Sequence, residues 1–520
     1  MFHTKLVSVE SGISAMGFRK ITAVARKVDP NVEVCFVPTD NLYSFASHFF
    51  PDKDARLGDK DINIISRYLS DADVVGFSSM TVSSPYVGKI ARMIKRINPK
   101  VYLIWGGVHT ELYPDETLKL VDAVCTGEGE ISMKLFMENL KKNRIRTDVP
   151  NMWFKTDKGI IKNKQLPLNS SDLMDHFPHP YNQKDCVLYN YKLHSFKSFD
   201  KFDYTQYNGL SYRTIWTLGC PYNCSYCAND SFIKMDVGYR RLRYASVEHV
   251  IDEIKTVKKI HPYISTVAFY DDNFITLPLD VIKNFSRQYK KEIGLPFVVF
   301  GIHPNTADRE KIDLLGRAGM NRMRMGIQSG SPDILKFFNR PTPVEKIKVS
   351  SGLLADAAKK YHMIAPSYDI ISDIPVQTPK DIKDTLELIY SIKKPFTLNV
   401  FSLRIFPKTQ LYDYVRRHPQ LKKYFKNTSY LDTRRTFNNM VLYLVATFKI
   451  PKFLFDRLVT IAIDKKNETK EFPLLYKAVN FCYLSKRGID HLMHFDFSTI
   501  TGRWVYYLWA IRNVRRRVFA

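Results

Sequence analysis

Short apolar runs alternate with amphipathic stretches through the first 145 residues. Two stretches, 18–28 and 86–97, repeat apolar residues at helical spacing. The apolar runs are five or six residues long, which suits buried strands, and they lie at Lys5–Val9, Val32–Val37, Asp73–Ser78, Val101–Trp105 and Asp122–Thr126. Strands that alternate with helices predict a Rossmann-like, doubly wound parallel sheet at 1–145, which binds ligands at the carboxyl ends of its strands.

The same alternation returns after a polar, proline-containing interval at 146–210, which we expect to be a linker. Strands are expected at 213–218, 265–270, 296–301, 322–328, 366–371 and 397–403, and helices at 246–260, 279–291, 308–318, 344–360 and 379–393. Six such units predict a partial TIM-like (βα)6 barrel at 211–412, with its chemistry at the carboxyl ends of the strands. The last segment, 413–520, is predicted to be a helical extension.

Composition limits the class of protein. A chain of 520 residues is too long for one ordinary core, and its apolar fraction of 45% is that of a globular protein. The chain has no signal-peptide run at its start and no run of roughly 18 apolar residues that would span a membrane. Its seven cysteines do not form a secreted pattern, so we expect a reducing, cytoplasmic location.

The net charge of +26 is concentrated toward the end of the chain. Residues 413–520 hold 21 Lys and Arg against 8 Asp and Glu, and the aromatics Trp504, Tyr506, Tyr507 and Trp509 precede the arginines Arg512, Arg515, Arg516 and Arg517. Three interpretations remain open: a helical cap over the barrel, a peripheral contact with the inner face of an anionic membrane, or RNA contacts.

Three cysteines carry the clearest chemistry. Cys220, Cys224 and Cys227 have the spacing C-x3-C-x2-C directly after the first predicted barrel strand. Soft thiolate ligands favour iron–sulfur or zinc sites, and no further Cys or His lies near enough to complete a structural zinc site. Three cysteines on a four-iron cluster would leave one iron open to a substrate. The alternative is a set of structural cysteines.

This string, with Leu218 and Gly219 before it and Tyr226 within it, resembles the cluster loop of the radical S-adenosylmethionine (SAM) superfamily. Over residues 1 to 412 the chain resembles cobalamin (B12)-binding-domain-containing radical SAM proteins. The resemblance implies three cofactors: a [4Fe–4S] cluster, SAM and cobalamin. It also implies an anaerobic enzyme.

The resemblance implies five residues that contact SAM. Tyr226 would flank the adenine ring. Asp271 and Asp272 close the second barrel strand, where the family binds the SAM amino group, although they are also suited to cap a helix. Gln328 and Ser329 lie in the string Gly-Ile-Gln-Ser-Gly-Ser, which resembles the family's Gly-Ile-Glu-Ser-Gly-Ser near the ribose and carboxylate.

Small residues follow the strands of the first segment, and the strings at 105–109 and 127–130 resemble the family's corrinoid signature. The resemblance implies a cobalamin site made of Ser14, Ser78, Met80, Gly106, Gly107, His109, Gly127 and Glu128. Ser14 stands where many corrinoid proteins have a cobalt-ligating His, so no lower axial ligand is expected from its loop. The alternative is a domain that kept its glycines for turns and binds no cofactor.

Other loops depart from the family pattern. Asp373, Val376 and Gln377 replace residues of the family's Gly-x-Pro-Gly-Glu-Thr string, and Lys408 replaces a glycine. These changes indicate either an unusual substrate or a divergent backbone. Arg324 could pair with a carboxylate or phosphate, or be structural.

The resemblance implies methyl transfer to an unactivated carbon or phosphorus centre, through a 5′-deoxyadenosyl radical and methylcobalamin. Two alternatives are a B12-dependent cyclase or rearrangement enzyme acting on a lipid or tetrapyrrole, and an RNA-modifying methylthiotransferase. The latter would need three more N-terminal cluster cysteines, and only Cys35 and Cys125 precede residue 186. Expected partners are a reduced flavodoxin- or ferredoxin-type electron donor and a small-molecule or lipid substrate, without nucleic acid.

Overall fold

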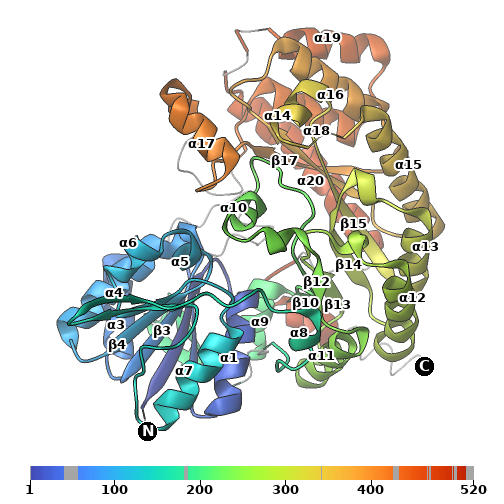
Figure 1. Ribbon diagram of the computed structural model, residues 1–520. Coiled ribbons are helices and arrows are strands. Elements are labelled where there is room, and N and C mark those ends of the chain that lie inside the picture. The colour runs from blue at the N-terminus through green and yellow to red at the C-terminus, as the bar shows by residue number, and fades with distance from the viewer. Residues whose placement is uncertain are drawn as a thin grey trace. The chain divides into compact units, whose positions relative to one another are not determined.

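The computed structural model describes residues 2–39, 57–180, 185–340, 342–424, 433–464, 466–467, 470–494, 496 and 500–510. The chain forms two compact units, which are both visible in Figure 1. The first unit comprises Met1–Thr214, Glu248–Ser265 and Phe497–Ala520, and the second comprises Ile215–Val247 and Thr266–Asp496.

The first unit is built on a nine-stranded sheet in the order β7-β6-β5-β4-β3-β1-β2-β8-β9. Its strands are β1 (Thr4–Glu10), β2 (Glu33–Pro38), β3 (Val74–Ser78), β4 (Tyr102–Gly106), β5 (Ala123–Cys125), β6 (Met152–Thr156), β7 (Gly159–Lys162), β8 (Val187–Asn190) and β9 (Ser195–Ser198). The pairs from β5 through β8 are parallel, and the first five strands lie within one residue of their predicted bounds. Since β2 and β3 lie on opposite sides of β1, the strand order reverses between β1 and β3.

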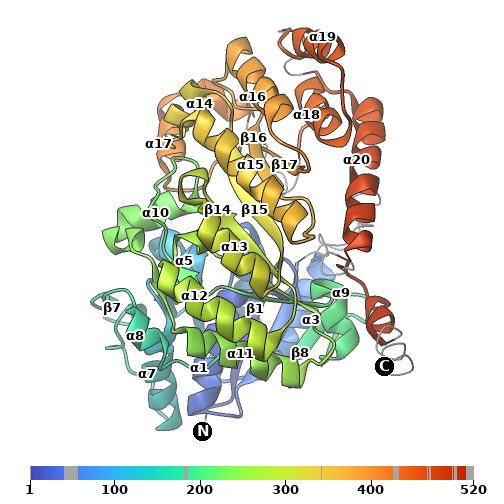
Figure 2. The same cartoon turned by 90° about the vertical axis from the view of Figure 1, so that its right-hand side faces the viewer.

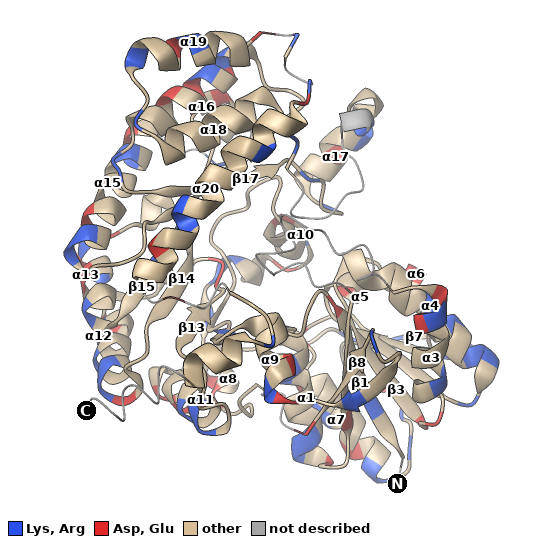
Figure 3. Ribbon diagram, turned by 180° about the vertical axis from the view of Figure 1, so that it is seen from behind, with Lys and Arg blue, Asp and Glu red and all other residues tan. Residues whose placement is uncertain are grey.

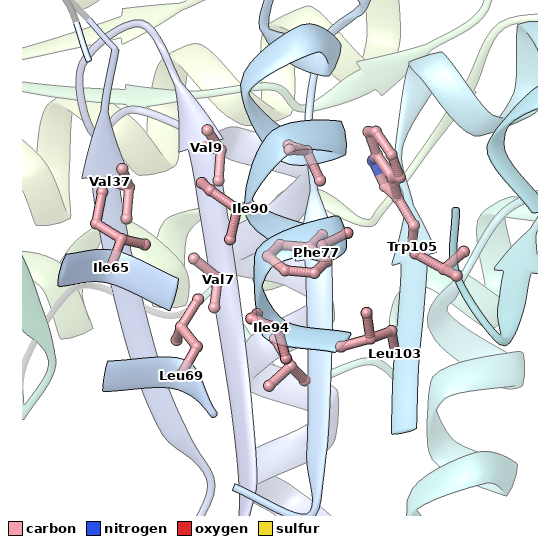
Figure 4. Packing of buried hydrophobic residues seen from close by; sticks show 14 of the residues in the cluster. Val7, Val9, Val37, Ile65, Leu69, Phe77, Ile90, Ile94, Leu103 and Trp105 are labelled. Carbon is pink, nitrogen blue, oxygen red and sulfur yellow. The ribbon is translucent and has the colours of Figure 1, made fainter. Parts of the chain in front are cut away.

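Helices cover both faces of this sheet. The helices α3 (Asp59–Leu69) and α4 (Ser84–Ile97) pack on one face, and α1 (Met16–Val28) and α7 (Glu130–Lys141) pack on the other. Alternate residues of β1 serve the two cores: Val7 and Val9 pack with Ile90 of α4, as Figure 4 shows, whereas Leu6 belongs to the opposite core. This alternation confirms the predicted doubly wound sheet.

The segment predicted as a linker, 146–210, is instead part of the first unit. Its strands β6 and β7 extend the sheet beyond β5, and its strands β8 and β9 extend the sheet beyond β2. The segment also contains α8 (Ser171–Met174) and α9 (Lys201–Asn208). Phe154 and Leu188 of this segment are buried in the core of the sheet. The prediction was wrong because these strands are only four or five residues long, and three of them join the sheet by antiparallel pairing at its edges.

Five strands of the second sheet belong to the second unit and follow one another in chain order, every pair parallel. They are β13 (Thr266–Phe269), β14 (Phe297–Ile302), β15 (Met320–Gln328), β16 (Ser367–Ser372) and β17 (Thr397–Ser402). Each lies within two residues of its predicted bounds. The predicted strand 213–218 is divided into β10 (Ser211–Thr214) and β11 (Thr217–Leu218), and β11 pairs with β12 (Arg243–Tyr244).

The predicted helices between these strands are also present. They are α11 (Val247–Ile260), α12 (Leu279–Gln288), α13 (Arg309–Ala318), α15 (Val344–Lys360) and α16 (Pro379–Ser391). Figure 2 shows α12, α13, α15 and α16 side by side along one face of the strands. Parallel strands with helices on the outside confirm the partial barrel.

The helical C-terminal extension is confirmed, and it covers the edge of β17, the last strand of the sheet. It contains α17 (Gln410–Arg417), α18 (Phe437–Thr447), α19 (Lys452–Ala462) and α20 (Pro473–Met493). The hydroxyl of Tyr483 on α20 accepts a hydrogen bond from Leu398 N (3.0 Å) and donates one to Leu398 O. These bonds satisfy backbone groups that an edge strand would otherwise leave unpaired. None of the helices in the described ranges is both long and apolar enough to cross a membrane.

Substituting Tyr483→Phe removes the hydroxyl that pairs with both backbone groups of Leu398. We expect the free energy of unfolding to fall by roughly 1–3 kcal/mol, because two buried backbone groups lose their partner. Urea titration followed by circular dichroism measures the change. The control is Tyr507→Phe, whose ring is 57% exposed; an equal loss in both variants would contradict the role assigned to Tyr483.

Candidate active site

The cysteine loop connects β11 to α10 (Ala228–Met235) and is held from several sides. Cys220 and Cys224 are buried, and Cys227 is half-buried. Gly219 has φ 99°, and a Cβ there would lie 2.3 Å from the carbonyl oxygen of Arg241, so only glycine fits. Cys220 N donates to Tyr239 O (2.9 Å). These backbone contacts help to hold the start of the loop in place.

The three thiols fit an iron–sulfur cluster better than a single metal ion. In the described residues, no group of three or more His, Cys, Asp or Glu side chains is arranged to hold one metal ion. A four-iron cluster does not need that arrangement, because each cysteine ligates a different iron. Burial raises the pKa of Cys220 to about 12, so loading a cluster must release the thiol protons.

Arg340, which the sequence analysis did not single out, lies beside this loop. Its Nη1 donates to the sulfur of Cys224 (3.4 Å) and its Nη2 donates to Gly326 O (2.6 Å). The side chain is buried, and its Nε has no hydrogen-bond partner among the described residues. A buried guanidinium with a spare N–H can pair with an anionic group next to the cysteines.

The two aspartates after β13 occupy different places. Asp271 is buried and accepts a hydrogen bond from Thr217 N, which holds the strand before the cysteine loop. Asp272 reaches solvent, but the surrounding protein raises the pKa of its carboxyl despite a hydrogen bond from Asn229. Burial raises the pKa of the thiols of Cys220 and Cys227, and the charge of Asp272 adds to this effect, which indicates that Asp272 lies near the cysteines.

Neither aspartate caps a helix. Asn273 is the N-cap residue of the short 3-10 turn Phe274–Thr276 and makes no side-chain cap, and Pro278 is the N-cap residue of α12. The helix-cap interpretation of this pair is therefore wrong. That Asp272 accepts hydrogen bonds from an ammonium group stays a prediction, whereas the hydrogen bond of Asp271 is structural.

Gln328 and Ser329 also differ from each other. Gln328 ends β15 with φ 75°, and its amide folds back over Gly326, the residue whose carbonyl binds Arg340. This places Gln328 close to the cysteine loop. Ser329 is buried and its hydroxyl pairs with Thr385 of α16 (3.1 Å), so it joins strand to helix.

Two aromatic contacts support the loop. The ring centroids of Tyr226 and Phe338 lie 4.7 Å apart, in an edge-on arrangement. Tyr226 also packs on a hydrophobic cluster under α14 (Pro332–Phe337). Its place beside adenine therefore stays a prediction. His303, which follows β14, stacks on Tyr222 of the loop at 3.8 Å between ring centroids. Its Nδ1 accepts from Asn305 N, and burial lowers the pKa of His303 to about 2, so the ring is neutral with its proton on Nε2.

Asp373, one of the departures from the family pattern, joins the barrel to the C-terminal extension. It has φ 53° and accepts hydrogen bonds from Ser402 at the end of β17 and from Asn439 of α18 (3.0 Å). Burial raises the pKa of its carboxyl. The departure from the family pattern at Asp373 therefore helps to attach α18 to the barrel.

In the first unit, the predicted cobalamin residues follow β1, β3, β4 and β5, at one edge of the sheet. Gly107 has φ 95°, and a Cβ there would lie about 3.1–3.3 Å from atoms of Ser78 and Ser79, so the loops after β3 and β4 are in close contact. Met80 is 47% exposed, and the Nδ1 of His109 is buried without a hydrogen-bond partner in the described part of the chain. Exposed apolar surface and an unsatisfied nitrogen beside a glycine loop fit a bulky cofactor.

Two of the predicted cobalamin residues are engaged with the protein itself. The hydroxyl of Ser14 donates to Asn208 Oδ1 and accepts from Arg213 Nη1, both at 3.0 Å. The carboxylate of Glu128 accepts from Asn169 N (2.5 Å). Gly106 and Gly127 lie at the same edge of the sheet, and their lack of a side chain leaves room for neighbouring residues. Of the predicted cobalamin residues, those in and around the loops after β3 and β4 are therefore the ones whose side chains are left open to a cofactor, and their role stays a prediction.

Sequence reasoning missed Arg340, Asn229 and His303. A single basic residue after a short helix, an Asn within a helix and a His before Pro carry no recognisable pattern. Their positions depend on contacts between segments more than 30 residues apart.

Two family models match the chain. The radical SAM superfamily model matches residues 214–389, and the B12 binding domain model matches residues 53–136. An uncharacterized methyltransferase of Pyrococcus horikoshii is 26% identical over 353 residues, which is 66% of this chain and 69% of that protein. The cytidylyl-2-hydroxyethylphosphonate methyltransferase of Streptomyces wedmorensis is 26% identical over 64% of each chain, so this chain spans just under two thirds of it.

Solved structures share the fold. The radical SAM methyltransferase TsrM of Kitasatospora setae, determined with cobalamin and a [4Fe–4S] cluster, matches 80% of this chain and 78% of its own, with a TM-score of 0.59 and 16% identity. The cobalamin-dependent SAM radical enzyme OxsB, with aqua-cobalamin bound, matches 98% and 84% with a TM-score of 0.62 and 14% identity. At these identities the likeness concerns the fold.

Replacing Cys220, Cys224 or Cys227 by Ala, one at a time, should abolish most cluster binding. We expect each variant to lose most of its iron and acid-labile sulfide after anaerobic reconstitution, because a cluster held by two thiolates is not stable. The matched control is Cys482→Ala, since this cysteine is exposed and distant from the loop in sequence. A loop variant that keeps the full iron content would remove that cysteine from the ligand set.

Substituting Arg340→Gln should lower the reduction potential of the reconstituted cluster. The guanidinium donates to Cys224 and stabilises the extra negative charge of the reduced state. A change on the order of 60 mV is expected for each 1.4 kcal/mol of lost stabilisation. A redox titration followed by electron paramagnetic resonance measures it. Lys336→Gln, which removes an exposed charge from α14, should leave the potential unchanged.

Proposed function

The chain is a B12-binding-domain-containing radical SAM protein, and we propose that it is a cobalamin-dependent methyltransferase acting on an unactivated carbon or phosphorus centre. One observation carries this proposal: a C-x3-C-x2-C loop after the first barrel strand occurs in the same chain as a B12-binding domain. Relatives named as methyltransferases support the reaction class. When bound, the cluster with SAM would supply radical chemistry and the corrinoid would supply methyl transfer.

The residues around the cysteine loop have separate tasks in this reaction. Cys220, Cys224 and Cys227 would hold the cluster. Asp272 would accept hydrogen bonds from the SAM ammonium group, and the spare N–H of Arg340 would pair with an anionic group of the ligand.

Arg324 of the barrel would contact the substrate. Arg324 lies on the face of β15 opposite to Met323 and Met325, which are fully buried, and its side chain is 31% exposed. Its Nε donates to both carboxylate oxygens of Asp369 (2.7 and 2.9 Å). Its two Nη atoms make no hydrogen bond to any described residue.

Aromatic rings flank this arginine. The guanidinium carbon lies 5.7 Å from the ring centroid of Phe300 and 5.5 Å from that of Phe401. Asn399 also donates to Asp369 (2.9 Å), which keeps the carboxylate in place. An arginine fixed in this way can bind a carboxylate or phosphate of the substrate through its Nη atoms.

An electron donor and a location belong to the same proposal. A reduced flavodoxin- or ferredoxin-type protein would supply electrons, and the net charge of +26 would attract an acidic carrier. Cluster-ligating cysteines suit the reducing cytoplasm, and we propose this location on that ground alone.

The test uses full-length protein reconstituted anaerobically with cluster, cobalamin and methyl-labelled SAM. We expect bound corrinoid, labelled methyl on cobalamin, and both S-adenosylhomocysteine and 5′-deoxyadenosine. Deoxyadenosine with bound cobalamin but no transfer of label would favour a cyclase or rearrangement enzyme. Failure to bind corrinoid would overturn the proposal and leave the radical SAM assignment alone.

Substituting Arg324→Gln should separate substrate binding from SAM cleavage. We expect 5′-deoxyadenosine formation without substrate to stay within about twofold of the wild type, whereas methylation of candidate anionic substrates falls at least about tenfold, since charge-assisted hydrogen bonds contribute on the order of 1.5–3 kcal/mol. Product analysis by mass spectrometry measures both. The control is Arg317→Gln on the exposed surface of α13. Equal loss of both products would make Arg324 structural.

A further inference from the structure

A short turn on the surface of the second unit lies directly against the cysteine loop. It follows α10 and consists of the 3-10 turn Val237–Arg240 and the next residue, Arg241. The chain then continues into β12, which pairs in antiparallel fashion with β11, the strand that leads into the cysteines. We call residues 237–241 the exposed turn.

Backbone contacts continue this pairing beyond the two strands. Cys220 N donates to Tyr239 O (2.9 Å), and a Cβ on Gly219 would lie 2.3 Å from Arg241 O. Neighbouring strands lie about 4.8 Å apart, so roughly one strand spacing separates the backbone of the exposed turn from that of the first cysteine. The exposed turn is therefore a part of the surface that comes close to the cluster ligands.

The exposed turn has a fixed backbone. Asp236 caps it, because its carboxylate accepts a hydrogen bond from Gly238 N (2.7 Å). Tyr239 N donates to Asp236 O (3.1 Å), and Arg241 N donates to Gly238 O (3.0 Å). The ring of Tyr239 also stacks on that of Phe232 in α10. A partner would meet a surface that is already ordered, which lowers the entropy cost of binding.

The side chains of this region combine apolar surface with positive charge. Val237 is 71% exposed, and Met235 at the end of α10 is 38% exposed. Arg240 and Arg241 are exposed too, and neither side chain makes a hydrogen bond or an ion pair with a described residue. Arginine next to apolar side chains is typical of protein-docking surfaces.

The unpaired charge of this region belongs to the exposed turn. Residues 234–243 hold four Lys and Arg against one Asp. Lys234 already pairs with Asp413 (3.0 Å), and Arg243 is buried. The two arginines of the exposed turn are the remaining cations. Figure 3 shows α10, which leads into the exposed turn, with the Lys and Arg positions of the chain in blue.

We propose that the exposed turn is the docking surface for the acidic protein that delivers electrons to the cluster. Its arginines attract acidic side chains of the carrier, and Val237 packs against the carrier's surface. One electron leaves the reduced carrier, which is oxidised, and enters the oxidised cluster, which is reduced; no covalent bond forms or breaks. Electron tunnelling falls steeply with distance, so the carrier must bind close to the cysteine loop. The inference rests on the electron donor proposed above, but not on methyl transfer.

Two other partners fit this surface less well. A second copy of the chain, with its net charge of +26, would bring like charges together. RNA would pair with the arginines through its phosphates, but its bases stack on open aromatic rings, and the ring of Tyr239 is already stacked on Phe232. An acidic protein matches both the arginines and the exposed apolar side chains.

The first experiment measures reduction of the full-length protein, reconstituted with its cluster, by an acidic ferredoxin in an anaerobic stopped-flow instrument. The double variant Arg240→Gln, Arg241→Gln should lower the second-order rate constant about tenfold at low salt and less at high salt, because its two lost charges steer the carrier. Reduction by reduced methyl viologen should stay within about twofold of the wild type, since this small cation does not dock.

The matched control is Arg309→Gln, Arg317→Gln, which removes two exposed charges from α13. Ferredoxin should reduce this variant like the wild type. An equal fall in both double variants would mean that net charge alone steers the carrier, and it would overturn the docking surface. A fall with methyl viologen as large as that with ferredoxin would also overturn it, because the arginines would then act on the cysteine loop itself.

A second measurement tests binding without electron transfer. Val237→Ser removes apolar surface without changing the charge, and we expect it to weaken the binding of oxidised ferredoxin at least about threefold in isothermal titration calorimetry. The control is Val349→Ser on α15, at a residue that is 65% exposed. Unchanged affinity in the Val237→Ser variant would contradict the contact proposed for this side chain.

The same titrations identify a different partner. Binding of a short RNA that the Arg240→Gln, Arg241→Gln variant weakens, with no binding of ferredoxin, would assign the surface to nucleic acid and overturn the proposal. A doubled mass in light scattering that this variant abolishes would assign it to a second copy of the chain. Neither experiment involves substrate or cobalamin, so failure of methyl transfer would not imitate any of these outcomes.

Discussion

Parallel strand pairing is the constraint on which both candidate sites depend. When neighbouring strands run in the same direction, the loops that follow them meet at one edge of the sheet. In the second unit this edge brings together Asp272 after β13, His303 after β14 and Gln328 at the end of β15. In the first unit it brings Ser78, the last residue of β3, against Gly107 after β4. Residues far apart in sequence become neighbours without any direct bond between them.

The cysteine loop shows how such an edge is made rigid. The loop itself contributes three thiols and Gly219, but its surroundings come from other segments: Arg340 binds Cys224, and Asp271 binds the backbone of Thr217. Each of these is a buried polar group that would be costly without its partner. The contact between Arg340 and Cys224 thus both holds the loop and places a cation beside the cysteines, whereas Asp271 only holds the strand before the loop.

An open barrel has an exposed last strand, and the C-terminal extension solves this problem. Tyr483 binds the edge of β17, and Asp373 attaches α18 to the ends of β16 and β17. This attachment gives one of the departures from the family pattern a structural reason. It also determines which side of α20 is buried against the barrel.

The sequence by itself determined the main strands and helices, the barrel, and the cysteines, because hydrophobic periodicity and close spacing are local properties. It did not reveal the strands of 146–210, since strands of four or five residues have no periodic signal, and β6 and β8 join the sheet only through their pairing with β5 and β2. Nor did it separate Asp271 from Asp272, assign Arg340 to Cys224, or tell which side of α20 is buried. Those features were decided by tertiary structure, because each depends on a partner more than 30 residues away, and the energy of a buried contact belongs to the pair of residues and not to either one alone.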